Sequence, residues 1–338
     1  MPKFRCLAEW FSVVLLILCM AVALSAQSNG NDPALLAKAK AGDAKAQVLV
    51  GLNCEMGYRV PQDYALAAFW YRKAADQGNA LAQVMLGKLY DQGQGVAQDY
   101  SQAATWYRKA AEQGFAPAQT MLGGRYDQGQ GVALDDSEAA IWYRKAAEQG
   151  DANAQDALGT LYRTGKGVPQ DYAQSAIWYR KAADQGNTDD EFYLGIFCDQ
   201  GIGVPQDHAA AAQWFRKAAE QNNANAQYNL GVKYATGSGV PQDYAQAVLW
   251  FRKAAEQGNA EAQLGLGLLY AQGQGVPQDY VEAYFWFDLA AAGKLDSANA
   301  ESATKNRDRA ASFLTPTDLS RAQERARKWF EEHPAKVQ

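Results

Sequence analysis

Residues able to carry out acid–base, nucleophilic or metal chemistry are scarce in this chain of 338 residues. It contains two histidines, His208 and His333, and four cysteines. Metal clusters and zinc sites draw mainly on these two residue types, so their scarcity argues against such a site. A general base at His208 would need a neighbouring nucleophile, and nothing in the sequence places one there. We therefore predict no catalytic residue, no metal, no cofactor and no enzymatic activity.

Three glycine pairs have the spacing of short phosphate-binding loops. These pairs are Gly129 and Gly131, Gly165 and Gly167, and Gly201 and Gly203. Each pair follows an expected helix instead of a strand, and none continues into the Gly-Lys-Ser/Thr ending of a nucleotide-binding loop. We interpret them as turn glycines with positive φ. Arg59 stands at the second position in the first copy of this motif, so either the turn tolerates a side chain there or the first copy is distorted.

The charge of the chain argues against nucleic acid as a partner. There are 32 Lys and Arg residues against 37 Asp and Glu residues, which gives a formal net charge of −5. Nucleic-acid binding needs basic residues gathered on one surface, and no stretch of the sequence concentrates them. A protein or peptide is the expected class of partner.

The N-terminal segment has the organisation of a signal peptide. Lys3 and Arg5 precede an apolar run over residues 11–24, and small residues lead up to Ala26. As a helix this run spans roughly 21 Å, short of the ~30 Å hydrocarbon core of a bilayer. We predict that residues 1–26 are cleaved, that no stable membrane span is left, and that the protein is exported, to the periplasm or the medium if it is bacterial.

A tandem repeat of 36 residues fills most of the chain. Positions 36 residues apart are called equivalent here. Tryptophan, glycine and aspartate recur in phase without an insertion, the tryptophans being Trp70, Trp106, Trp142, Trp178, Trp214, Trp250 and Trp286. This period is typical of a solenoid, whose units must stack on one another to bury their apolar faces.

Each repeat is predicted to be a helix–turn–helix unit. In the second repeat Ala82, Leu86 and Tyr90 have the spacing of one helix face, and glycines follow them. A second helix starts at Asp99, with a buried face that includes Trp106. We expect a capping helix over residues 27–42, seven repeats over 43–294 and a helical cap over 295–338.

Two contacts within these repeats can be predicted. Gly87 lets the two helices approach closely, and Trp106 and Tyr90 are expected to fill the space beside it. On the outer side, Arg108 and Glu112 lie one turn apart and are expected to form a weak ion pair.

The recurring run LG-x-x-Y-x-x-G-x-GV-x-x-D-x-x-x-A-x-x-W-x-x-KAA-x-QG resembles the Sel-1-like repeat, a relative of the tetratricopeptide repeat. The resemblance implies an all-α, right-handed superhelical solenoid and a role as adaptor or scaffold. A cysteine-rich branch of that family staples each repeat with a disulfide and is associated with β-lactam binding or hydrolysis. This chain lacks that cysteine pair.

The two cysteines beyond the signal peptide, Cys54 and Cys198, occupy positions that are Tyr in the other repeats. Four repeats at roughly 10 Å per helix layer separate them by about 40 Å, well beyond the reach of a disulfide. We predict that both are buried thiols, and that His208 likewise replaces an aromatic residue.

The candidate binding surface lies on the first helices, at positions that vary between repeats. At two of these positions repeats five to seven carry apolar and aromatic residues, and with a neighbouring tyrosine they define the apolar strip: Phe192, Tyr193, Ile196, Tyr228, Val232, Leu264 and Leu268. The strip either lines the solenoid groove, as a peptide-binding hot spot, or packs between repeats. Asp189, Asp190 and Glu191 are expected to place negative charge beside it, which would suit a basic-hydrophobic partner.

These observations predict a non-catalytic, exported scaffold that binds a protein or peptide partner in the solenoid groove. Two alternatives remain. One is a β-lactam-interacting hydrolase, which the cysteine-rich branch of the family suggests. The other is a purely structural protein of envelope assembly.

Overall fold

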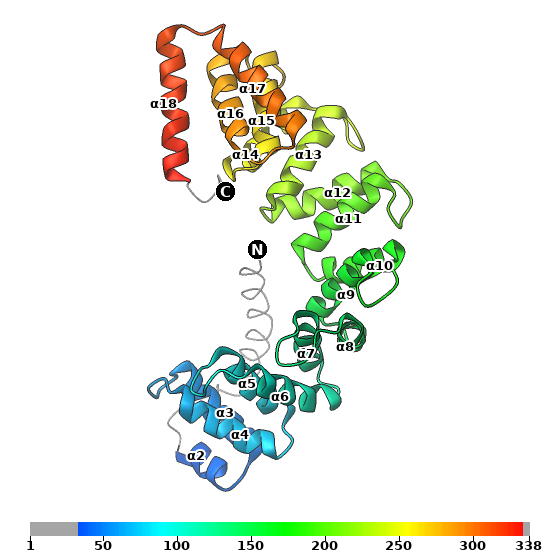
Figure 1. Ribbon diagram of the computed structural model, residues 1–338, viewed down its shortest axis with the longest axis vertical. Coiled ribbons are helices and arrows are strands. Elements are labelled where there is room, and N and C mark those ends of the chain that lie inside the picture. Colours follow the sequence, from blue (N-terminus) through cyan, green and yellow to red (C-terminus); the bar gives the residue numbers. More distant parts are fainter. Residues whose placement is uncertain (1–32, 334–338) are drawn as a thin grey trace. The chain divides into compact units, whose positions relative to one another are not determined.

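The computed structural model describes residues 33–333. Seventeen α-helices and no strands occur in this range (Figure 1). The prediction of an all-α fold built from helix–turn–helix repeats is therefore confirmed. The predicted signal peptide, residues 1–26, lies outside the described residues. Between residues 33 and 333 no helix is long and apolar enough to cross a membrane.

The chain divides into two compact units within α10. Unit 1 ends at Trp178 and contains α2 (Pro33–Lys40), α3 (Ala44–Met56), α4 (Tyr64–Asp76), α5 (Ala80–Gln92), α6 (Tyr100–Glu112), α7 (Ala116–Gln128), α8 (Asp136–Glu148), α9 (Ala152–Thr164) and the first part of α10 (Tyr172–Ala183). Unit 2 continues with α11 (Thr188–Gln200), α12 (His208–Glu220), α13 (Ala224–Thr236), α14 (Tyr244–Glu256), α15 (Ala260–Gln272), α16 (Tyr280–Ala292), α17 (Ser297–Ala311) and α18 (Pro316–Glu332).

Capping residues set the helix boundaries that the repeat predicts. The Asp99 carboxylate accepts from the backbone N–H groups of Ser101 and Gln102 at 2.9 and 3.0 Å. It therefore satisfies two backbone donors that have no acceptor within α6. The preceding helix, α5, ends at Gly93, which has φ +66°. Ala82 and Leu86 of α5 and Trp106 of α6 are buried, as predicted.

The second glycine of the interhelical turn lies against the preceding repeat in repeats two, three, four, six and seven. A Cβ atom at Gly95, which has φ +69°, would be 2.2 Å from the Tyr64 carbonyl carbon. Arg59 takes the same left-handed conformation, with φ +59°, at the equivalent position of the first repeat. The turn therefore tolerates a side chain at Arg59, and the turn interpretation of these glycines is confirmed.

Close helix approach depends on a residue that the sequence analysis did not single out. At Gly87 a Cβ atom would be 2.7 Å from the ring of Tyr107, so this ring covers the glycine. The predicted partner Trp106 is buried in the cluster that contains Leu86 and Leu89. The prediction was wrong by one residue, because Tyr107 is the aromatic residue that faces α5.

Arginine joins consecutive repeats on the outer side. The guanidinium of Arg108 donates to the hydroxyl of Tyr126 in the next repeat at 2.5 Å, and Arg144 does the same to Tyr162. The expected pair between Arg108 and Glu112 is therefore replaced by a hydrogen bond across the repeat boundary. These bonds tie the stack together because each spans 18 residues of sequence.

The last helix covers the end of unit 2. Ala322 and Ala326 of α18 are fully buried, and Leu319, Trp329 and Phe330 pack against the same hydrophobic cluster. This cluster also contains Phe285 and Phe287 of α16. The apolar face of α18 therefore shields aromatic residues that would otherwise meet water.

Candidate protein-binding surface

The seven residues of the apolar strip lie together in unit 2, on the first helices of three consecutive repeats. Phe192, Tyr193 and Ile196 belong to α11, Tyr228 and Val232 to α13, and Leu264 and Leu268 to α15. Leu264 is buried, with 7% of its surface exposed, while the other six are half-buried. Each of the six therefore presents part of its surface to solvent.

The aromatic rings of the strip rest on rings of the second helices. Tyr193 stacks on Tyr179 with 5.3 Å between ring centroids, and Tyr228 stacks on Phe251 at 5.8 Å. The ring centroids of Phe192 and Phe215 are 6.1 Å apart. The inner face of each ring thus joins the core. The strip therefore has features of both alternatives considered for it. Its side chains pack against neighbouring helices, and part of their surface is still accessible to solvent.

The acidic residues beside the strip are placed differently from the prediction. Asp190 is fully buried and Glu191 is 4% exposed, so neither contributes an accessible charge. Asp189 is exposed and accepts from the Asn223 side chain at 3.4 Å. The prediction of a three-residue acidic surface was wrong, because the positions of Asp190 and Glu191 face the helix core in every repeat.

Glu191 interrupts a ladder of buried glutamines. In the second repeat the Gln83 amide donates to the Ala75 carbonyl at 3.1 Å and accepts from Gln113 at 2.8 Å. Glu191 is equivalent to Gln83 and accepts from Gln221 at 2.7 Å. An ionised carboxylate has no proton to donate to the carbonyl of Ala183, the residue equivalent to Ala75. Burial raises the pKa of Glu191, against the lowering effects of Lys217 and Gln221.

Replacing Glu191 with glutamine is expected to stabilise unit 2. The variant restores the missing donor, and one net hydrogen bond contributes about 1 kcal/mol. Because folding raises the Glu191 pKa, the cost of burying its charge is greatest above the folded pKa and declines as the pH falls through it. Urea unfolding at pH 7 and pH 4.5 should show that E191Q increases the free energy of unfolding more at pH 7 than at pH 4.5. An equal or smaller gain at pH 7 would contradict this account.

A second charged cluster joins repeats five and six. The Lys233 ammonium, only 7% exposed, contacts the Asp199 carboxylate, and His208 Nδ1 lies 2.6 Å from the same carboxylate. Burial alone would raise the pKa of Asp199, but the hydrogen bonds and charges of Lys233 and His208 outweigh burial and lower it. His208 does occupy the tyrosine position, as predicted, and in addition it pairs with Asp199. The sequence does contain one indication of this cluster, because Lys233 occupies a position that is Leu89 and Leu269 in other repeats.

The Asp199 cluster predicts a loss of stability in acid. Because folding lowers the Asp199 pKa, its contribution is complete above the unfolded value of about 3.9 and disappears as the pH falls through the folded pKa. Asp199→Asn should therefore destabilise unit 2 at pH 7. The difference in unfolding free energy between the variant and the wild type should become smaller below about pH 4. Urea unfolding over pH 3–7 checks this. A difference independent of pH would show that the carboxylate charge is irrelevant.

Cys54 and Cys198, the cysteines within the described residues, are free, buried thiols. Burial, as the leading cause, raises the pKa of both Cys54 and Cys198, which disfavours the reactive thiolate. Arg180, whose equivalents donate to a tyrosine hydroxyl, instead lies over the Trp214 ring, 4.7 Å from its centroid. Cys198 thus changes a contact between repeats without creating a nucleophile.

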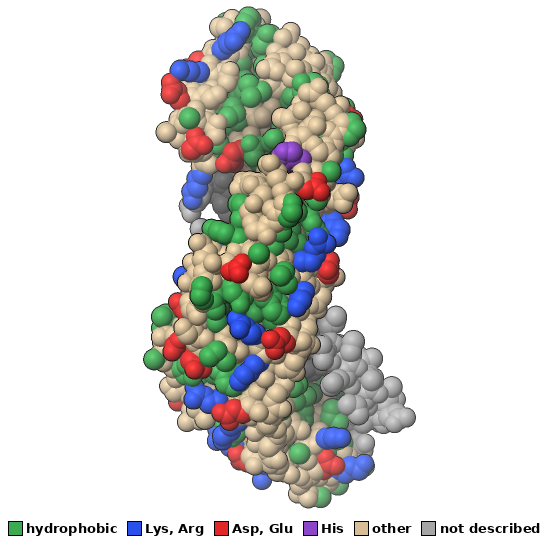
Figure 2. Space-filling view, turned by 90° about the vertical axis from the view of Figure 1, so that its right-hand side faces the viewer, with side chains coloured by type: hydrophobic (Ala, Val, Ile, Leu, Met, Phe, Trp, Pro, Cys, Tyr) green, Lys and Arg blue, Asp and Glu red, His purple; other side chains and the backbone are tan. Residues whose placement is uncertain are grey.

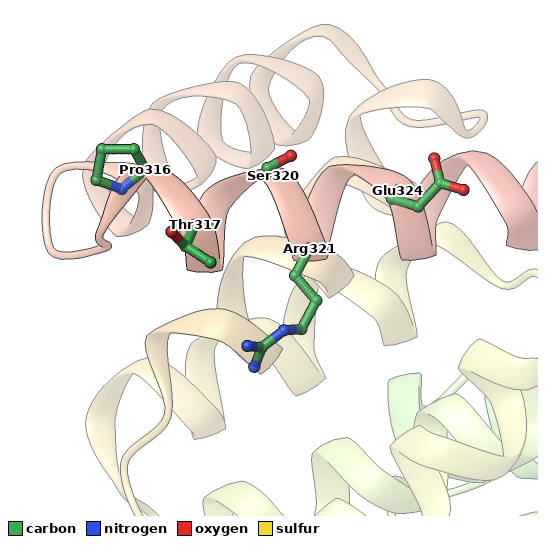
Figure 3. A pocket seen from close by; sticks show the side chains of 5 residues that line it. All are labelled: Pro316, Thr317, Ser320, Arg321 and Glu324. Atoms are coloured by element: carbon green, nitrogen blue, oxygen red, sulfur yellow. The ribbon is translucent and has the colours of Figure 1, made fainter.

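Other parts of the surface offer less to a ligand. In the described residues no group of three or more His, Cys, Asp or Glu side chains is arranged to hold a metal ion. An open hollow on α18 is lined by five exposed residues: Pro316, Thr317, Ser320, Arg321 and Glu324 (Figure 3). On the face shown in Figure 2, basic side chains alternate with acidic ones instead of forming a basic patch.

Comparison with known protein families identifies the repeat. The Sel1 repeat model matches residues 44–79, 80–115, 116–151, 152–187, 189–223, 224–259, 260–294 and 308–332. The chain belongs to the Sel1 repeat family. The eighth match falls within the region predicted to be the C-terminal cap, on the end of α17 and on α18. Sel1 repeat proteins generally act as scaffolds for protein interactions.

One solved structure supports this assignment. A Sel1 repeat protein from Oxalobacter formigenes is 36% identical over 74% of this chain and 98% of its own, with a TM-score of 0.60. The protein c5321, described as a protective antigen of uropathogenic Escherichia coli with an SLR fold, is 31% identical over 90% of this chain and 87% of its own, with a TM-score of 0.37. No curated protein matches the chain.

Proposed function

We propose that this Sel1 repeat protein is an exported, non-catalytic adaptor that binds a protein partner along the apolar strip of α11, α13 and α15. The observation that carries the proposal is six half-exposed apolar or aromatic side chains on three consecutive first helices. Anchored rings with an exposed outer surface are typical of binding hot spots, because little conformational entropy is lost when a partner covers them.

The fold itself does not require apolar residues at these positions. The residues equivalent to Tyr228 include Thr120, and those equivalent to Leu268 include Lys88 and Thr160. The repeats that carry these polar residues stack in unit 1 with the same helix–turn–helix geometry. Apolar residues in repeats five to seven therefore have a role beyond stacking, and recognition of a partner accounts for it.

The strip fits a partner segment that is mainly apolar and carries a basic residue. Burial raises the pKa of the Tyr228 hydroxyl, and the negative charge of Glu261 raises it further, so a carboxylate lies close to the strip. Asp189 adds an exposed carboxylate at the start of α11. A lysine or arginine in the partner would meet these charges at the edge of the apolar contact.

Export is proposed from residues 1–26, which have the basic, apolar and small-residue regions of a signal peptide. N-terminal sequencing of the protein recovered outside the cytoplasm should begin at Gln27. Retention of residues 1–26 would contradict cleavage.

Affinity capture tests the adaptor function. The mature chain, immobilised and exposed to the exported fraction, should retain a discrete partner that mass spectrometry identifies repeatedly. Replacing the exposed Leu249 of α14, which lies outside the strip, with serine provides a control that should retain the same partner. Capture of no partner, or of a set that changes between preparations, would contradict the proposal.

A further inference from the structure

The third repeat lacks a clamp, the hydrogen bond that a glutamine just before the second helix donates to a backbone carbonyl in the other six repeats. In the second repeat the Gln98 amide donates to the Asp91 carbonyl at 2.8 Å and to the Tyr100 hydroxyl at 3.0 Å. Glutamine recurs at this position in every repeat except the third, where Leu134 replaces it. The tyrosine is replaced by Asp136 in the third repeat and by His208 in the fifth. Leu134 cannot form the clamp, so its presence needs another explanation.

Leu134 lies in the interhelical turn, two residues before α8 begins. It is 65% exposed, the largest fraction among the exposed large hydrophobic residues of the described range, and Ile141 of α8 is 48% exposed. Glu138 lies between them and is half-exposed. The spacing of three residues puts Glu138 and Ile141 on one side of α8, which lies within unit 1 (Figure 1), and Leu134 precedes the first turn of that helix. Leu134, Glu138 and Ile141 are called the α8 face below.

The equivalent face of the seventh repeat is occupied. Its residues Glu282 and Phe285 are equivalent to Glu138 and Ile141, and Phe285 is only 2% exposed. The Arg325 guanidinium of α18 lies over the Phe285 ring, 3.8 Å from its centroid, and pairs with the Glu282 carboxylate. Ala322 and Ala326 of α18 are buried in the same cluster as Phe285 and let the helix approach closely. The face of α16 therefore binds a helix that carries an arginine with one alanine three residues before it and another directly after it.

The third repeat shares with the seventh the acidic residue that pairs with the arginine. At the position of Glu138 and Glu282 the other repeats carry Leu66, Gln102, Gln174, Ala210 and Gln246. Within residues 33–333 no ion pair is formed by Glu138, whereas Glu282 is bound to Arg325. The α8 face thus combines apolar surface with an accessible carboxylate, which is the complement of α18.

We propose that the α8 face is a second docking site, which accepts an amphipathic helix of another protein with an arginine between two small residues. The chain's own α18 is held on α16 by an intramolecular link of four residues, 312–315, so its effective concentration there is high. A separate protein that carries a helix of this chemistry is the occupant of the α8 face. This site is independent of the apolar strip in unit 2.

A synthetic peptide with the sequence of residues 316–332 tests the proposal, because it carries Arg325 between alanines. It should bind the full chain in fluorescence anisotropy. The variant Leu134→Gln/Glu138→Gln/Ile141→Thr introduces the residues that the second repeat carries, Gln98, Gln102 and Thr105. This variant should keep its fold and bind the peptide at least tenfold more weakly, and an R325E peptide should bind the wild-type chain at least tenfold more weakly.

Three outcomes would overturn the proposal. They are no detectable binding of the wild-type peptide, equal binding by the triple variant, and self-association of the chain that the triple variant abolishes. The last would make a second copy the occupant. Circular dichroism of the triple variant shows whether its repeats stay folded, and a single Glu138→Gln variant provides a milder change if they do not.

Discussion

Gly123→Ala is expected to destabilise unit 1 by about 1–3 kcal/mol, the usual cost of an added methyl group in a filled core. A Cβ atom at Gly123 would lie 2.8 Å from the ring of Tyr143, closer than two carbon atoms can approach without rearrangement. Tyr143 is buried, so its ring cannot move aside freely. The variant should show a lower urea midpoint, because α7 and α8 are forced apart.

The neighbouring residue provides a matched control. Gly124 lies in the same helix, α7, and a Cβ atom there would lie 3.6 Å from the Tyr143 hydroxyl, an ordinary contact distance. Gly124→Ala should be stabilising by about 0.5–1 kcal/mol, since alanine favours a helix over glycine. Urea unfolding followed by circular dichroism should therefore shift in opposite directions for the two variants. A shift in the same direction would contradict the role given to Gly123.

The double variant Tyr228→Thr/Leu268→Lys is expected to weaken partner binding at least a hundredfold. Hot-spot residues contribute about 2 kcal/mol or more each, and two of them together correspond to roughly three orders of magnitude in Kd. Both changes introduce residues that other repeats carry at equivalent positions, Thr120 and Lys88. Binding of the partner found by affinity capture should be measured by calorimetry.

Stability must be separated from recognition in this experiment. The stacking of Tyr228 on Phe251 contributes to the core of unit 2, so the variant's urea midpoint should be measured alongside. Leu249→Ser removes an exposed apolar residue of α14, outside the strip, and should leave Kd unchanged. A folded double variant with wild-type affinity would show that the strip is not the binding surface.

The sequence alone predicts the architecture well because each repeat restates the same physical constraints. Asp99 and its equivalents cap the second helices, and the glycine spacing places the turns. Seven copies in phase make these assignments redundant. The neighbour of each residue was harder to predict, as Tyr107 shows: it covers Gly87, although the adjacent Trp106 had been expected there. A difference of one residue rotates a side chain by 100° around a helix, and only the packed structure decides between the two.

The electrostatic features were least accessible to the sequence. Asp190 and Glu191 follow Asp189 in an acidic run, yet two of the three are buried because they fall on the core side of α11. The cluster of Lys233, Asp199 and His208 joins residues 9 and 34 positions apart on three helices. Such pairings depend on the register between stacked repeats, which composition and spacing do not specify.

Site-specific photo-crosslinking tests the central claim, that the apolar strip is the surface that holds the partner. A photoreactive residue at Val232, in the middle of the strip, should form a covalent adduct with the partner, whereas one at Leu249, on the second helix of the same repeat, should not. Adducts from Val232 alone are the predicted result. Adducts from Leu249 and none from Val232 would place the partner elsewhere and contradict the account.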